Sequence, residues 1–145
     1  MWYRIFSSES TMPTPEELRA FLAAGHGEFA ADDGGWYRGD LKVDSISFEI
    51  ERYVADEPGI RAELNGWAAW LETREGEPEH TRLMERVIQT RQLFTLRADE
   101  DSSRAAEKCL ALCRFIAEKT SGIYQIDGEG FYSVEGRTLV SEPEA

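Results

Sequence analysis

The segment WYRGDLKVDSISFEIERYV (Trp36–Val54) decides the fold class of this chain. Within residues 46–51 apolar and polar side chains alternate, which is typical of a strand with one face on the core and the other in water. Residues 36–43 form a matching strand, and Asp44–Ser45 is a connection of hairpin length between the two. The segment therefore predicts an antiparallel hairpin.

Short runs of β-branched and aromatic residues predict further strands at residues 2–6 and 89–97 and within 122–140. Neighbouring strands joined by short turns pair antiparallel, so we expect an α+β fold with a mainly antiparallel sheet. Because each helix carries a single apolar stripe, we expect the helices to pack on one side of that sheet. Residues 1–145 are expected to form a single globular domain whose last residues, 141–145, are frayed.

Amphipathic periodicity predicts the helices. Thr14, with Pro15 next and Glu17 three residues later, forms a capping box that starts a helix ending at Gly25. Longer apolar stripes predict helices within residues 56–75 and 102–120. A shorter helical piece contains Leu83, Met84 and Val87.

Each half of the chain has the same predicted order of strand, helix and hairpin, with a helical linker between the halves. The stretch FLAAGHGEFAADDGGWY of the first half aligns with FIAEKTSGIYQIDGEGFY of the second. Two explanations stay open: duplication of one ancestral unit, or a shared architecture without common ancestry. The matched residues include Phe21 with Phe115 and Asp33–Gly34 with Asp127–Gly128.

The acidic stretch GIYQIDGEGFY (Gly122–Tyr132) has two interpretations. Asp127–Gly128 between alternating apolar residues predicts a type I′ hairpin turn, which needs positive φ at both central residues. Alternatively, Asp127 and Glu129 belong to a functional loop that holds a metal or a substrate. An EF-hand loop is excluded because Tyr132 occupies the sixth position, where glycine is required. The turn is the favoured interpretation.

The chain is strongly acidic, with a net charge of −12 and a pI near 4.6. Such a charge repels nucleic acid and anionic membranes and favours a basic protein partner, although it also serves simply to keep a protein soluble. No apolar run approaches the roughly 18 residues of a membrane span. The first residues, MWYRIFSSES, lack the pattern of an export signal, so a cytoplasmic location is expected.

Sequence motifs for common catalytic chemistries are absent: the chain has no P-loop, no nucleophile elbow and no dinucleotide fingerprint. Neither of the two histidines has a neighbouring zinc ligand at helical or hairpin spacing. Cys109 and Cys113 are expected to be reduced core thiols rather than a redox or metal pair. Glu49 and Glu51 share a strand face, where solvation or protection of a sheet edge explains them better than catalysis. We expect no catalytic residue, metal or cofactor.

Two functions remain. The first is a non-enzymatic interaction protein that binds a basic protein; in size and charge the chain is similar to bacterial immunity proteins, which neutralise toxins, although no motif supports membership of such a family. The alternative is a small-ligand-binding domain or small enzyme with an acidic and aromatic pocket. The candidate interaction or pocket residues are Trp36, Trp70, Tyr124, Asp127, Glu129 and Tyr132.

Overall fold

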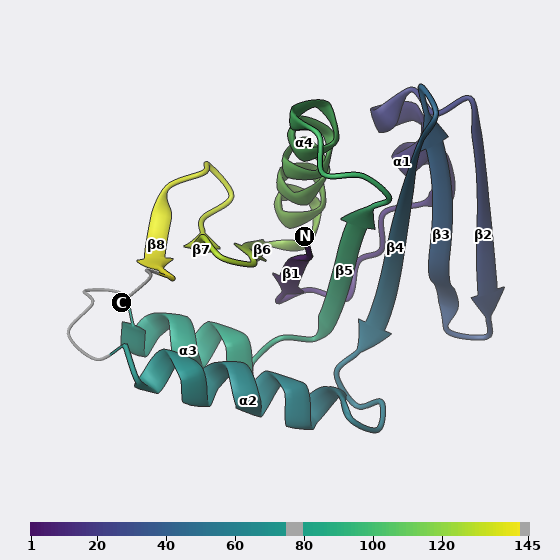
Figure 1. Cartoon of the computed structure of the whole chain (residues 1–145). Helices are drawn as coiled ribbons and strands as arrows, with labels where there is room; N and C mark the ends of the chain where they lie inside the picture. The colour runs from purple at the N-terminus through teal and green to yellow at the C-terminus, as the bar shows by residue number, and fades with distance from the viewer. Residues whose placement is uncertain (75–79, 143–145) are drawn as a thin grey trace.

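The computed structural model describes residues 1–74 and 80–142 of the chain (Figure 1). In chain order its elements are β1 (Tyr3–Ser7), α1 (Pro15–Leu22), β2 (His26–Asp32), β3 (Gly35–Val43), β4 (Ile46–Val54), α2 (Ile60–Glu72), α3 (His80–Ile88), β5 (Gln92–Ala98), α4 (Ser103–Thr120), β6 (Gly122–Ile126), β7 (Gly130–Tyr132) and β8 (Thr138–Ser141).

All the strands join one sheet in the order β2-β3-β4-β5-β1-β6-β7-β8, and every neighbouring pair is antiparallel. The predicted α+β class with an antiparallel sheet is confirmed. The first strand of the chain lies inside the sheet, where β1 pairs with β5 on one side and with β6 on the other.

The predicted hairpin between β3 and β4 is present, and Val43 pairs with Ile46 across its turn. Asp44 and Ser45 have φ angles of 51° and 67°, so this turn has the positive φ at both central residues that a type I′ turn requires. The apolar residues of β4 at positions 46, 48 and 50 are all buried, as the alternation predicts.

The helix starts follow from their capping residues. Thr14 accepts a hydrogen bond from the Glu17 backbone at α1, and the Glu17 side chain accepts one from Thr14, so the capping box is confirmed. The left-handed residue that ends α1 is Ala23, with φ of 53°, rather than the predicted Gly25. At α4, the Ser102 side chain caps the Ala105 backbone N–H.

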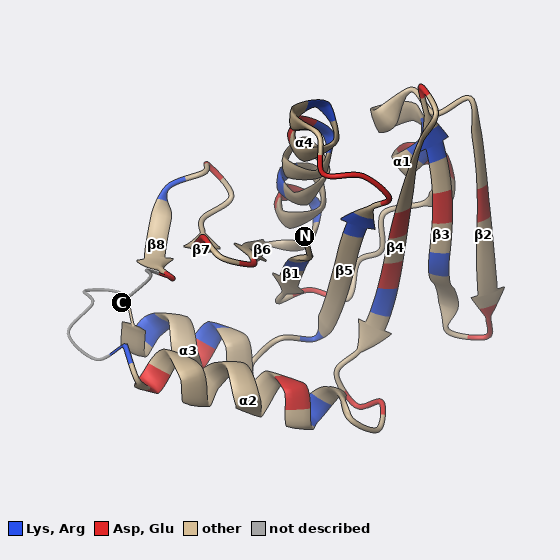
Figure 2. Ribbon diagram, in the orientation of Figure 1, with Lys and Arg blue, Asp and Glu red and all other residues tan. Residues whose placement is uncertain are grey.

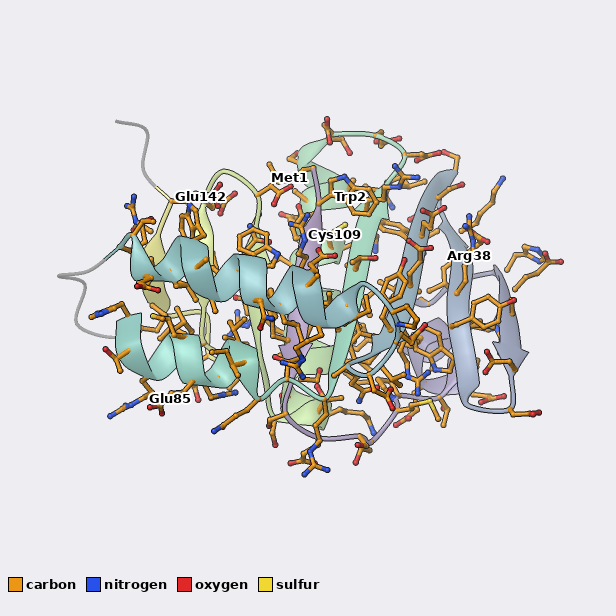
Figure 3. The ribbon with its side chains drawn as sticks, turned by 90° about the horizontal axis from the view of Figure 1, so that it is seen from below. Met1, Trp2, Arg38, Glu85, Cys109 and Glu142 are labelled. Atoms are coloured by element: carbon orange, nitrogen blue, oxygen red, sulfur yellow. The ribbon has the colours of Figure 1, made fainter. Side chains whose placement is uncertain are left out.

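Helices cover both faces of the sheet, where the sequence pattern predicts them on one side. α1 and α4 pack on the face that carries Ile5, and α2 and α3 pack on the face that carries its neighbour Phe6. Figure 3 shows α2 and α3 in front of the strands. The central strands are apolar on both faces, as Leu93 and Phe94 of β5 show, so each face needs its own cover.

The two halves have the same order of elements, each a strand, a helix and a three-stranded meander. Their meanders attach differently: β4, the last strand of the first meander, lies innermost, whereas in the second meander the innermost strand is the first, β6. The matched residues Phe21 and Phe115 stack on each other, with ring centroids 4.3 Å apart.

The end of the described chain is tied to the sheet. Ser141 is the last residue of β8, and the backbone N–H of Glu142 donates to the Glu129 carbonyl oxygen. Of the segment expected to be frayed, residues 143–145 lie outside the described residues. Among the residues that the structure describes, none of the helices has the length and apolar character that crossing a bilayer demands.

Candidate functional site: an acidic rim at one end of the sheet

Seven acidic side chains lie at one end of the sheet, in the β3–β4, β5–α4 and β6–β7 connections and just after β8. We call this set the acidic rim. The red connection between β5 and α4 in Figure 2 contains three of its members in sequence. The residues of the acidic rim are Asp44, Asp99, Glu100, Asp101, Asp127, Glu129 and Glu142.

Backbone contacts bring these separate connections together. Asp99 follows β5, and its backbone N–H donates to the Ser47 carbonyl oxygen at the start of β4, 2.9 Å away. The N–H of Asp127, after β6, donates to the carbonyl oxygen of Trp2, just before β1, over 3.1 Å. Since neighbouring strands lie about 4.8 Å apart, the row of connections from β3 to β8 extends over roughly 25–30 Å.

Several rim carboxylates are fixed by contacts of their own. Asp44 forms an ion pair with Arg104 of α4. The Asp99 carboxylate accepts a 3.0 Å hydrogen bond from the Ser47 backbone N–H. Glu100 has no hydrogen bond or ion pair to any residue in the described ranges and is exposed. The rim thus combines acids whose side chains are held by contacts with acids that are solvated.

Asp127 is the most firmly held acid of the rim. Its carboxylate accepts hydrogen bonds from the Arg4 guanidinium, at 2.6 Å, and from the Gln125 side chain, at 2.9 Å. The Arg4 guanidinium also lies over the Trp67 ring, 5.0 Å from the ring centroid. Asp127 therefore links the rim to the layer formed by α2, a role beyond that of a turn residue.

The turn after β6 differs from the predicted type I′ geometry. The Glu129 N–H donates to the Ile126 carbonyl oxygen over 3.0 Å, and positive φ, 82°, occurs at Gly128 but not at Asp127. This places glycine at the third position of the turn, as in a type II turn. Asp33–Gly34 also lacks positive φ, which occurs next to it at Gly35.

Glu129 belongs to a small aromatic group beside the rim. The Tyr132 hydroxyl donates a 3.0 Å hydrogen bond to the Glu129 carboxylate, and the Tyr132 ring stacks on Tyr124 with centroids 5.4 Å apart. Burial, helped by the Glu129 contact, raises the pKa of Tyr132 to about 12. A tyrosine is protonated at neutral pH in any case, and the raised pKa keeps this phenol a donor to higher pH.

Trp36 and Trp70 lie away from this group. Trp36 is buried among α1, β3 and β5, and its indole N–H donates to the Pro13 carbonyl oxygen over 2.7 Å. Trp70 packs beside Phe131 in the α2 layer on the opposite face of the sheet. The structure thus brings together Tyr124, Glu129 and Tyr132 of the six candidates, whereas Asp127 contacts Arg4 and Gln125 and the two tryptophans lie elsewhere.

The other groups considered from the sequence, Glu49 and the two cysteines, make contacts that stabilise the fold. Glu49 lies on an interior strand, where its carboxylate accepts from Arg38 and Arg97. Cys109 and Cys113 are free and buried, and burial raises the pKa of the Cys109 thiol to about 12. Within residues 1–74 and 80–142, no three His, Cys, Asp or Glu side chains converge to hold a metal ion.

The sequence prediction missed most of the acidic rim. From the sequence, Asp44 is a turn residue and Glu142 belongs to the segment expected to be frayed, and the acids at positions 99–101 are not among the candidates. A signal is present, because acids follow the predicted strands at 36–43 and 89–97 and lie within the predicted strand-and-turn segment 122–140, and antiparallel neighbours place alternate connections at the same end of a sheet. The strand order needed to use that signal was missing.

No protein-family model, no curated protein and no solved structure matches this chain.

Proposed function

We propose that the chain is a non-enzymatic interaction protein that binds a basic protein partner at the acidic rim. The observation that carries the proposal is the gathering of seven acids, from connections far apart in the sequence, at one end of the sheet. Recognition and blocking of a basic protein is the class of role that immunity proteins have.

The size of the rim suits a protein partner. A row of roughly 25–30 Å matches one dimension of a standard interface, which buries about 800 Å² on each partner. The net charge of −12 steers a basic partner toward the molecule, and the local concentration of acids orients it. Such association is fast and weakens as salt rises.

The alternative of a small-molecule pocket built on the six sequence candidates has less support. A cavity of about 700 Å³ is present in the structure, but none of the six lines it. Tyr124 is buried beneath Tyr132, and Asp127 is occupied by Arg4 and Gln125. These side chains build the sheet end rather than line a concave site.

The test distinguishes the effect of the position of the acids on binding from the effect of the total charge. Glu100→Lys with Glu129→Lys reverses two rim acids. Asp33→Lys with Glu85→Lys changes the net charge equally at exposed acids outside the rim. Asp33 lies in the β2–β3 connection, at the other end of β3 from Asp44, and Figure 3 shows Glu85 far from Met1 and Glu142.

Affinity capture from lysate of the source organism, with the wild type and both variants as bait, gives the readout. We expect a basic protein at stoichiometric yield with the wild type and the control pair, and at least about tenfold less with the rim pair. Equal loss with both pairs would show that net charge alone is responsible. Absence of any stoichiometric basic protein from the wild-type capture would reject the proposal.

A further inference from the structure

A second feature, at the other end of β6 from Asp127, is a cleft of about 700 Å³. We call it the α3–α4 cleft, because α3 forms one wall and the end of α4 another. Its third wall is the β7–β8 connection, and its floor is the start of β6. Residues that line it include Leu83 and Arg86 of α3, Ala117 and Ser121 at the end of α4, Ile123 of β6 and Val134.

The walls of the α3–α4 cleft are held by the fold. The Arg114 side chain donates to the carbonyl oxygens of Val134 and Glu135, which fixes the β7–β8 connection against α4. The Arg137 backbone N–H donates to the Ser133 hydroxyl oxygen over 3.1 Å and closes the same connection. A cavity of this size with fixed walls falls within the range of roughly 300–1,000 Å³ found for small-molecule sites.

The inner surface of the cleft is mainly apolar and contains one half-buried cation. Val134 and Leu139, which are only partly buried, supply accessible hydrocarbon surface, above the buried side chains of Leu83, Ala117 and Ile123. Arg86 donates a single hydrogen bond, of 3.1 Å, to the Ser121 carbonyl oxygen within the described part of the chain. A guanidinium has five N–H donors, so Arg86 retains donors for a further acceptor.

The charges around the cleft favour an anion beside Arg86. Two further arginines, Arg82 and Arg137, line the cleft, and so do two carboxylates, Glu118 and Glu135. Both carboxylates are exposed, whereas Arg86 is half-buried, so the less solvated charge is positive. Electrostatic attraction is stronger where water is partly excluded.

We propose that the α3–α4 cleft binds a small organic acid: an apolar body with one carboxylate or phosphate group. The body would lie on Val134 and Leu139, and the anionic group would accept hydrogen bonds from Arg86. Arginine suits both head groups, since its planar fork matches carboxylate and phosphate oxygens. This site is separate from the acidic rim and does not depend on the protein partner.

The test is an amide NMR titration of the full chain with hexanoate, hexyl phosphate and hexanol. The two acids distinguish the head groups, and hexanol has the same apolar body without charge. We expect saturable shifts at Gly122, Ile123 and Val134 with at least one acid and much weaker shifts with hexanol. Arg86→Met should weaken acid binding by about tenfold or more, and Arg86→Lys should retain most of it.

Arg61→Met is the matched control. Arg61 also donates one hydrogen bond to a carbonyl oxygen at a helix end, that of Ile88 at 2.8 Å, but it does not line the cleft. Gln89→Glu, an isosteric change on the cleft wall, should weaken acid binding without unfolding the chain, and it keeps the test decisive if Arg86→Met does not fold.

Four results would overturn the proposal: no saturable shifts with either acid, equal binding of hexanol, full binding after Arg86→Met, or equal loss after Arg61→Met. If Arg86→Met is unfolded, full binding by Gln89→Glu would overturn it instead. A saturable response at the named amides, lost in Arg86→Met and kept in Arg61→Met, supports it.

Discussion

Arg4, at the start of the chain, donates a hydrogen bond of 2.6 Å to the Asp127 carboxylate after β6. Asp127→Asn removes the ion pair but keeps an oxygen acceptor, so we expect the free energy of unfolding to fall by about 1 kcal/mol, a value reduced for the partial exposure of the pair. Glu129→Gln should change it by less than about 0.5 kcal/mol, because an amide oxygen still accepts from Tyr132. Urea unfolding of both variants measures the difference, and equal midpoints would contradict it.

The two glycines of the same connection should differ sharply. A Cβ at Gly128 meets no atom within 4 Å, whereas a Cβ at Gly130 would lie 2.1 Å from the Val140 carbonyl oxygen. We expect Gly128→Ala to cost about 1 kcal/mol through positive φ alone, and Gly130→Ala to cost about 3 kcal/mol or more because β8 must move. Thermal unfolding of the two variants tests this, and similar melting temperatures would be the opposite result.

The β3–β4 turn offers a stabilising change. Ser45 has φ of 67°, a conformation that glycine adopts without steric strain. Ser45→Gly should therefore raise the free energy of unfolding by about 0.5 kcal/mol. Ser47→Gly, two residues later and inside β4, should lower it by about 0.5–1 kcal/mol. Chemical denaturation of the pair gives both signs, and destabilisation by Ser45→Gly would argue against the turn.

The buried thiols predict a loss of stability in alkali. Burial raises the pKa of Cys109 from 9.0 to about 12 and raises that of Cys113 well above 9.0. At pH values between about 9 and 12, the thiols of the unfolded chain release their protons, whereas those of the folded chain keep them. The free energy of unfolding therefore falls as pH rises above about 9. From pH 8 to pH 10 we expect a loss of roughly 1–3 kcal/mol from the two thiols together.

The control for this effect is Cys109→Ala with Cys113→Ala, measured by guanidinium unfolding at the same pH values. Partly buried tyrosines such as Tyr132 add their own alkaline loss at higher pH, and the double variant retains that part. An unchanged pH dependence in the double variant would show that the thiols do not cause it.

Arg52 is a buried cation that binds carbonyl oxygens instead of a carboxylate. It donates to the carbonyl oxygens of Trp36 and Gly34 and to the Gln92 side chain, at 2.8, 3.2 and 3.0 Å. Arg52→Met leaves these acceptors unpaired, and we expect a loss of about 2–4 kcal/mol. Arg38→Met, at an exposed arginine of the same sheet, should cost less than about 1 kcal/mol. Equal losses in denaturant unfolding would contradict the structural role of Arg52.

The sequence predicted the elements whose signals are local. The β3–β4 hairpin and the α1 capping box both depend on residues within a few positions of one another, and both are present. Strand β2 was missed because HGEFAAD has few β-branched or aromatic residues and lies at the sheet edge, where only β3 supports it. Pairing with β3, and not the composition of β2 itself, keeps β2 in the sheet.

The layers and the site depend on contacts that are distant in the sequence. The adjacent apolar residues Ile5 and Phe6, and Leu93 with Phe94, lie on opposite faces of their strands, and the helices that cover the two faces come from distant parts of the chain. Likewise, the predicted turn at Asp127 gave no information about Arg4, which is 123 residues away in the chain. A hydrophobic pattern does not show which distant residues form such pairs.

The inner position of β1 determines when its strand pairings can form during synthesis. β1 is synthesised before both strands that flank it, which are residues 92–98 and 122–126. At about 5–20 residues per second, β1 waits roughly 5–25 s for its neighbours. The β2–β3–β4 meander, whose pairings are local, forms in the meantime. The nascent chain therefore carries β1 unpaired until the strands at residues 92–98 and 122–126 have been synthesised.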